Sequence, residues 1–92
     1  MRLMLQFTIP VERGNQAEAD GSLKVAIERL VATTQPEAAY FHLKDGKRAG
    51  TIYFEATGPD QMPAINEPLF AALDAAIEIQ PVNRLDELIA NL

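Results

Sequence analysis

The stretch PLFAALDAAIEIQPV, residues 68–82, changes its hydrophobic period part-way along. It begins inside a helical pattern and ends with Ile77 and Ile79 alternating about Glu78, which is the period of a strand. Pro68 cannot donate a backbone hydrogen bond inside a helix, so we expect the helix to end or kink near residues 66–68. The chain then crosses into a strand at about residues 75–81, where the isoleucines face a core and Glu78 faces a second surface.

The rest of the chain divides into segments of the same two periods. Residues 2–9 alternate and end at Pro10, and a helical spacing follows from Asn15, which can cap a helix. The triplet Asp20-Gly21-Ser22 interrupts that helix. Either the helix tolerates the glycine, or it ends near Asp20 and Ser22 caps a second segment; we favour an interrupted helix. The segments expected are strands at 2–9, 39–44, 51–56 and 75–81, helices at 15–34 and from 57–60 onward, and a terminal helix at 83–92 capped by Asn83.

A hairpin joins the two middle strands. We expect the turn at DGKRAG, residues 45–50. Phe41 and Leu43 must share a face with Ile52 and Phe54, so the numbers of paired residues must sum to an odd value, 93 or 95.

The order of elements is strand, helix, strand, strand, helix, strand, followed by a terminal helix. This is the ferredoxin-like βαββαβ arrangement of an α+β domain. Right-handed crossovers place the strands of a four-stranded antiparallel sheet in the order 4-1-3-2, with both helices on one face. We therefore expect residues 1–92 to form a single domain whose other sheet face is uncovered.

Composition excludes several classes of function. The 92 residues carry a formal net charge of -5, which disfavours nucleic acid and anionic membranes as partners. The chain has no cysteine, which fits a cytoplasmic location and excludes thiolate metal sites. No apolar run reaches the ~20 residues of a membrane span, and the N-terminal residues fit a strand better than a signal peptide.

Several motifs resemble a known superfamily. FTIPVERGN and PEAAYFHLKDGKRAG, together with Pro68-Leu69-Phe70 ahead of Ile77-Glu78-Ile79, are similar to the dimeric α+β barrel superfamily. The likeness is to muconolactone-isomerase-like proteins and to uncharacterised small bacterial proteins of this shape. It implies a homodimer whose two sheets pack face to face, often around a ligand cavity. The chain departs from this pattern in a longer connection between Phe70 and the last strand, and no catalytic motif carries over.

The alternation assigns ten residues to the uncovered face of the sheet. They are Met4, Gln6, Thr8, Tyr40, His42, Thr51, Tyr53, Glu55, Glu78 and Gln80. This mixture is more polar than a sealed interface and more aromatic than a solvated face, as is common in binding pockets.

We expect three of these residues to carry proton-transfer chemistry. His42 would move a proton, and Glu55 or Glu78 would orient it. The ligand-binding candidates are Gln6, Tyr40, Tyr53 and Gln80. Solvated carboxylates, interface salt bridges and cross-strand tyrosine packing would explain the same residues without any ligand. No metal site or cofactor is expected, because one histidine with scattered carboxylates lacks ligand spacing.

Two functions remain open at the level of sequence. The first is binding of a small organic ligand between the sheets of a homodimer, with a cofactor-free isomerase or monooxygenase as the possible enzyme. The alternative is a non-catalytic interaction module, in which the sheet face seals a dimer and Leu85, Leu88 and Ile89 of the terminal helix pack on the partner.

Overall fold

Four antiparallel strands form one sheet in the order β2-β3-β1-β4, which confirms the predicted order. The computed structural model describes all 92 residues. Its elements are β1 Arg2–Ile9, α1 Val11–Asp20, α2 Ser22–Thr34, β2 Ala38–Lys44, β3 Lys47–Glu55, α3 Gln61–Leu73, β4 Ala76–Pro81 and α4 Leu85–Ala90. The predicted ferredoxin-like arrangement with a terminal helix is therefore the observed one.

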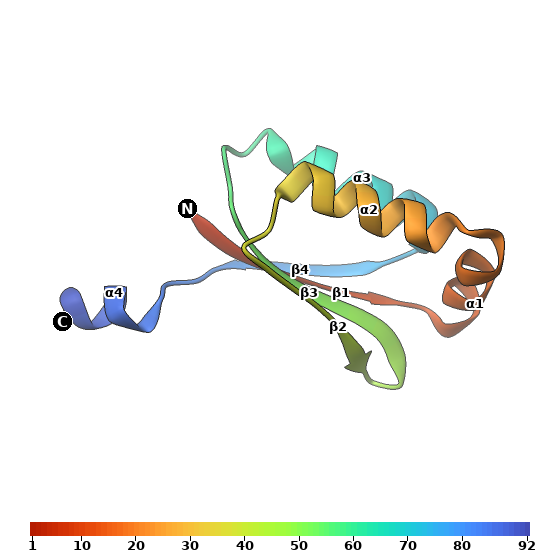
Figure 1. Cartoon of the computed structure of the whole chain (residues 1–92), viewed down its shortest axis with the longest axis horizontal. Coiled ribbons are helices and arrows are strands. Elements are labelled where there is room, and N and C mark those ends of the chain that lie inside the picture. Colours follow the sequence, from red (N-terminus) through yellow and green to blue (C-terminus); the bar gives the residue numbers. More distant parts are fainter.

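Helices α2 and α3 lie side by side over one face of the sheet (Figure 1). The core between the two layers includes Leu5, Phe54, Ile65, Leu69 and Leu73, each no more than 2% exposed. Burial of one such side chain contributes roughly 1.5–3 kcal/mol. No element of the chain covers the opposite face, which we call the open face.

The register of the hairpin differs from the expected one. Phe41 pairs with Gly50, so paired residue numbers sum to 91 rather than 93 or 95, although the odd parity is right. The turn consists of Asp45 and Gly46 alone, and both have positive φ. Asp-Gly is well suited to this tight hairpin turn, and Lys47 therefore already belongs to β3.

Helix α3 continues through Pro68, so the expected end near residues 66–68 is wrong. Leu69 and Leu73, both beyond the proline, are buried against the sheet. Their combined burial is comparable to the ~3 kcal/mol that an interior proline costs. The helix ends instead at Asp74, which has φ of 51° and donates its backbone N–H to the carbonyl of Phe70.

The first helical region is interrupted at Gly21 and consists of two helices, α1 and α2. Helix α1 begins at Val11, directly after Pro10, rather than at Asn15. Gly21 has φ of 85° and turns the chain between α1 and α2 (Figure 1). Ser22 does not supply the cap. Its backbone N–H donates to the carboxylate of Asp20 at 2.8 Å. The side chain of Ser22 first, and this backbone bond second, lower the pKa of Asp20.

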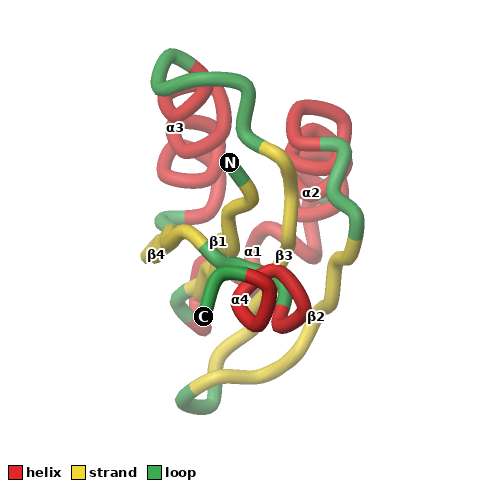
Figure 2. Tube along the Cα trace, turned by 90° about the vertical axis from the view of Figure 1, so that its left-hand side faces the viewer, coloured by secondary structure: helices red, strands yellow, loops and turns green.

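Helix α4 projects away from the domain beyond the end of the sheet (Figure 1), and in Figure 2 it is the part of the chain nearest the viewer. None of its residues is buried, and no side chain caps its N-terminus, so Asn83 does not play the expected role. A hydrogen-bonded ion pair between Arg2 and Glu87, 3.0 Å long, ties α4 to β1. None of the helices combines the length and apolar character that crossing a membrane requires.

Candidate functional site

The central strand β1 sets up the candidate site on the open face. Gln6 pairs with Thr51 of β3 on one side and with Glu78 of β4 on the other. Because residues paired across antiparallel strands project on the same face, these three side chains form one row. His42 lies on the next row, where it pairs with Ala49.

Hydrogen bonds join three of these side chains. The Nε2 of His42 lies 2.7 Å from the Oγ1 of Thr51, and the Nε2 of Gln6 donates to that same oxygen at 3.3 Å. The Nδ1 of His42 lies 3.1 Å from the carbonyl oxygen of Leu43. A carbonyl oxygen can only accept, so Nδ1 carries the proton of the neutral ring and Nε2 accepts from the Thr51 hydroxyl.

Thr51 is 7% exposed, although it lies on the open face. The sequence places it on this face but gives it no role. Its role depends on its position opposite Gln6, and the sequence does not show that position because it depends on the register between β1 and β3.

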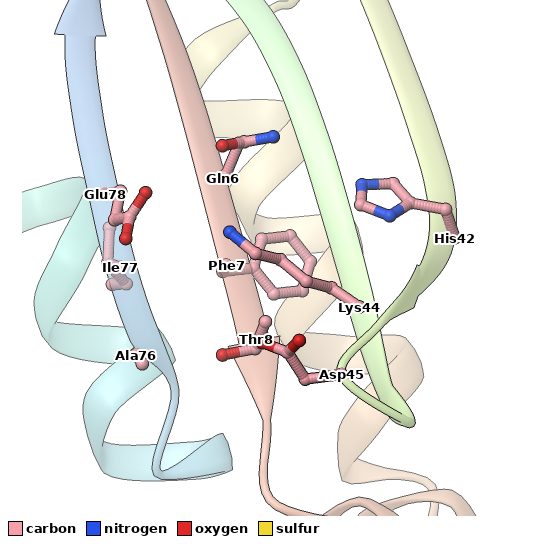
Figure 3. Close-up of a pocket in the computed structure, with 9 residues that line it drawn as sticks. All are labelled: Gln6, Phe7, Thr8, His42, Lys44, Asp45, Ala76, Ile77 and Glu78. Atoms are coloured by element: carbon pink, nitrogen blue, oxygen red, sulfur yellow. The ribbon is translucent and has the colours of Figure 1, made fainter.

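A hollow of about 240 Å³ lies beside this row (Figure 3). Glu78 and His42 stand on opposite sides of it. The Lys44 side chain extends across it in front of Phe7, and Asp45 lies beside Thr8 at the hairpin end. Its lining is Gln6, Phe7, Thr8, His42, Lys44, Asp45, Ala76, Ile77 and Glu78. Oppositely charged groups therefore face the hollow together with neutral hydrogen-bonding side chains.

The other predicted ligand contacts lie elsewhere. Tyr53 and Gln80 line a second hollow of about 470 Å³ near the start of α4, together with Met4 and Arg84. Tyr40 is 63% exposed at the sheet edge, where it lines an apolar groove between β2 and α2. Only Gln6 of the four predicted ligand-binding residues shares the hollow with His42.

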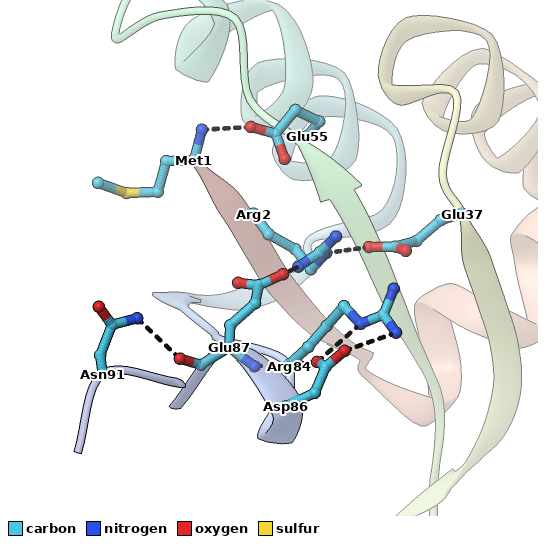
Figure 4. A network of polar contacts seen from close by, with 8 residues as sticks. All are labelled: Met1, Arg2, Glu37, Glu55, Arg84, Asp86, Glu87 and Asn91. Atoms are coloured by element: carbon cyan, nitrogen blue, oxygen red, sulfur yellow. Dashed lines mark hydrogen bonds and ion pairs between the residues drawn. The ribbon is translucent and has the colours of Figure 1, made fainter. Parts of the chain in front are cut away.

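Glu55 is not near His42. It pairs with Arg2 at the far end of β3, six residues from Ala49, which corresponds to roughly 20 Å of strand. Its carboxylate accepts a hydrogen bond from the Met1 amine (Figure 4). This hydrogen bond lowers the pKa of Glu55. Of the two predicted carboxylates, Glu78 alone faces the hollow.

Arg2 organises the polar contacts at that end of the sheet. Its guanidinium donates to Glu87 of α4 and to Glu37, which precedes β2 (Figure 4). These two hydrogen bonds raise the pKa of Arg2 above its usual value. The second hollow therefore adjoins an arginine that is already paired.

Comparison with known proteins bears on the fold. The chain matches no protein-family model, and no curated protein matches it. A de novo designed protein, Ferredog-Diesel, superposes with a TM-score of 0.52 at 10% identity, covering 88% of this chain and 85% of the other. The periplasmic divalent cation tolerance protein CutA from Archaeoglobus fulgidus superposes with a TM-score of 0.52 at 15% identity, covering 98% of this chain and 93% of CutA. The fold is ferredoxin-like.

These likenesses extend to the fold alone. At such identities the residues of a site do not carry over, because one fold hosts many functions. The description of the hollow therefore rests on this chain's own side chains. No three of its histidine, aspartate and glutamate side chains gather as a group that could hold a metal ion.

Proposed function

We propose that the chain binds a small polar organic molecule on the open face, in the hollow beside His42. The observation that carries the proposal is the hydrogen-bonded array of Gln6, Thr51 and His42 on a face that nothing in the chain covers. Such an array fixes the direction of its donors and acceptors before a ligand arrives, which lowers the entropic cost of binding. Glu78 adds a carboxylate on the opposite side of the hollow.

In this proposal a second copy of the chain covers the open face. A hollow of about 240 Å³ is smaller than the ~300–1,000 Å³ typical of ligand pockets, and it opens onto the sheet surface. A second sheet stacked ~10 Å away would enclose it. The resemblance of FTIPVERGN and Pro68-Leu69-Phe70 to the dimeric α+β barrel superfamily supports this face-to-face homodimer.

The chemistry proposed is proton transfer without a cofactor. In neutral His42 the Nε2 lone pair is engaged by the Thr51 hydroxyl. A proton leaving the ligand therefore reaches His42 through that hydroxyl, or directly once the hydroxyl turns aside. Glu78 would orient the ligand through its carboxylate. An isomerase is the enzyme class that fits this step, and the cofactor-free monooxygenase is a second option from the same superfamily resemblance.

Residues outside the hollow receive smaller roles in the proposal. Glu55 is left out, because its carboxylate is held by Met1. Tyr53 and Gln80 would contact a ligand long enough to extend into the second hollow. No cation function is carried over from CutA, since the likeness to it extends to the fold alone.

The test is a screen of small planar acids and lactones followed by two-dimensional NMR of the labelled protein. We expect a binder to shift the Gln6 side-chain amide and the backbone signals of His42, Thr51 and Glu78. Thr51→Val and Glu78→Gln should each weaken that binder about tenfold through a lost hydrogen bond.

Two glutamines on the open face provide a test variant and its matched control. Gln6→Leu should weaken binding, whereas Gln80→Leu, in the second hollow, should leave a compact ligand unaffected. Equal responses of the two variants, or binding unchanged by all of these substitutions, would place the ligand elsewhere and overturn the proposed site.

The alternative is an interaction module without a ligand. It is favoured by one observation, the exposed apolar residues of α4, among which Leu85 is 72% and Ile89 is 64% exposed. In that case two copies would associate and the screen would find no ligand on the open face.

A further inference from the structure

The hydrogen bonds around His42 form a chain with one direction. The Nδ1–H of His42 donates to the carbonyl of Leu43, which leaves Nε2 to accept the proton of the Thr51 hydroxyl. That hydroxyl has a single proton, so its oxygen can meet only a donor from Gln6. The Gln6 amide is thereby oriented, with its nitrogen toward Thr51 and its oxygen toward β4 (Figure 3).

The amide oxygen of Gln6 lies next to a second acceptor. Gln6 and Glu78 are paired directly across β1 and β4, so their β-carbons are roughly 4.5–5.5 Å apart. The Gln6 side chain makes its hydrogen bond through Nε2, and neither its oxygen nor the Glu78 carboxylate accepts one from the chain. Two adjacent acceptors, one of them negatively charged, fit a group with positive charge and several N–H bonds, such as an ammonium.

A positively charged side chain shares the hollow with these acceptors. Lys44 extends across the hollow in front of Phe7, a level that lies one residue, or roughly 3.3 Å, from Gln6 along β1 (Figure 3). The four ion pairs of the chain are all made by the N-terminal amine or by an arginine. Lys44 and Glu78 therefore line one hollow with opposite charges and without an ion pair of their own.

We propose that the hollow binds an α-amino acid as its zwitterion, an inference that rests on the proposed function. The ammonium donates to Glu78 and to the amide oxygen of Gln6, and the carboxylate accepts from Lys44. One carbon separates the two charged groups of an α-amino acid, which matches the one-residue offset between the acceptors and the lysine. A simple acid brings a second anion to Glu78, and a simple amine brings a second cation to Lys44. The exposed Asp45, at the hairpin end, takes no part.

Three matched compounds separate the two contacts. Alanine carries both charged groups, ethylamine lacks the carboxylate, and propionate lacks the ammonium. Each compound is titrated into isotope-labelled protein, and the NMR signal of the Gln6 side-chain amide reports binding. Alanine should bind at least about tenfold more tightly than either of the others, because each of its charged groups meets an opposite charge. The other common α-amino acids, each with its own amine and acid, extend the series to larger side chains.

Substitution of the charged side chains tests which group meets which end of the ligand. Lys44→Gln should weaken amino acid binding about tenfold and should not weaken amine binding. Glu78→Gln should weaken amino acid binding by a similar factor and should not weaken acid binding. Lys47→Gln is the matched control, because Lys47 pairs with Lys44 across the hairpin but does not line the hollow. All three positions are exposed, so the variants should fold, which circular dichroism checks.

Failure of this inference and failure of the proposed function give different results. If planar acids or lactones shift the Gln6 signal and no α-amino acid does, the inference is wrong and the proposed function stands. The inference is also wrong if the amine or the acid binds as tightly as the amino acid, or if Lys44→Gln and Lys47→Gln have equal effects. If no compound of either series shifts the signals of Gln6 and Glu78, both proposals are wrong.

Discussion

Gly50 shows how one residue fixes the packing of the sheet. It lies in β3 opposite both Phe7 and Phe41, and the Phe7 ring rests over its α-carbon. A Cβ at position 50 would overlap the ring, whose edge atoms Cε1 and Cζ fill that space. Phe7 is only 3% exposed, so the ring cannot move aside without disturbing the core.

Gly50→Ala should therefore destabilise the protein by about 1–3 kcal/mol through overpacking. Urea unfolding measures the change, and Gly58→Ala serves as the control. A Cβ at Gly58 meets the flexible end of Asp60, which can turn away. A Gly50→Ala protein as stable as the control would show that the Phe7 ring is not confined.

At the scale of residues, the sequence predicts well which face of the sheet a side chain lies on, but it predicts poorly which side chains on that face are neighbours. Alternation alone assigns Gln6, His42 and Glu78 to the open face, and all three line the same hollow. It also groups Glu55 with them, because parity does not say how far along a strand two residues lie. That distance depends on the register, which the two-residue turn at Asp45-Gly46 sets.

At the scale of elements, α3 shows burial prevailing over local propensity. Pro68 is in the helix interior, yet the helix continues because Ile65, Leu69 and Leu73 on either side of it are buried together. Without its backbone N–H, Pro68 leaves the carbonyl of Ala64 without its usual helical donor. The proline is therefore a local cost that the packing of α3 offsets.

Pro68→Ala should stabilise the protein by about 1–2 kcal/mol. Alanine restores the helical hydrogen bond and its helix propensity, and part of that gain is offset because alanine leaves the unfolded chain more conformational freedom than proline does. Pro63→Ala is the matched control in the first turn of the same helix, where proline costs little. Urea unfolding of both variants measures the difference. A loss of stability in Pro68→Ala, or equal effects at the two positions, would contradict this explanation of α3.

The start of the first helix was misplaced for a different reason. Pro10 ends β1 and also begins α1 directly after it, whereas the cap signature at Asn15 suggested a later start. In the structure, the Asn15 side chain instead accepts a hydrogen bond from Arg48 at 3.0 Å. Short polar side chains serve caps and tertiary contacts equally well, so their presence alone does not locate a helix end.

At the scale of the whole molecule, the one-sided sheet is the feature that the sequence predicts best. The order β2-β3-β1-β4 and the helical layer on one face follow from the chirality of the crossovers. What covers the open face and α4 cannot be predicted this way, because a single chain contains no information about contacts that only a second molecule completes. The proposed function places a second copy over the open face.

The most direct test of this account is the mass of the native protein in solution, measured by light scattering behind a sizing column over a range of concentrations. The account predicts a particle of twice the 10.1 kDa of one chain. A mass of 10.1 kDa at every concentration would contradict it, since His42 and Glu78 would then face open water and no second sheet would enclose the hollow.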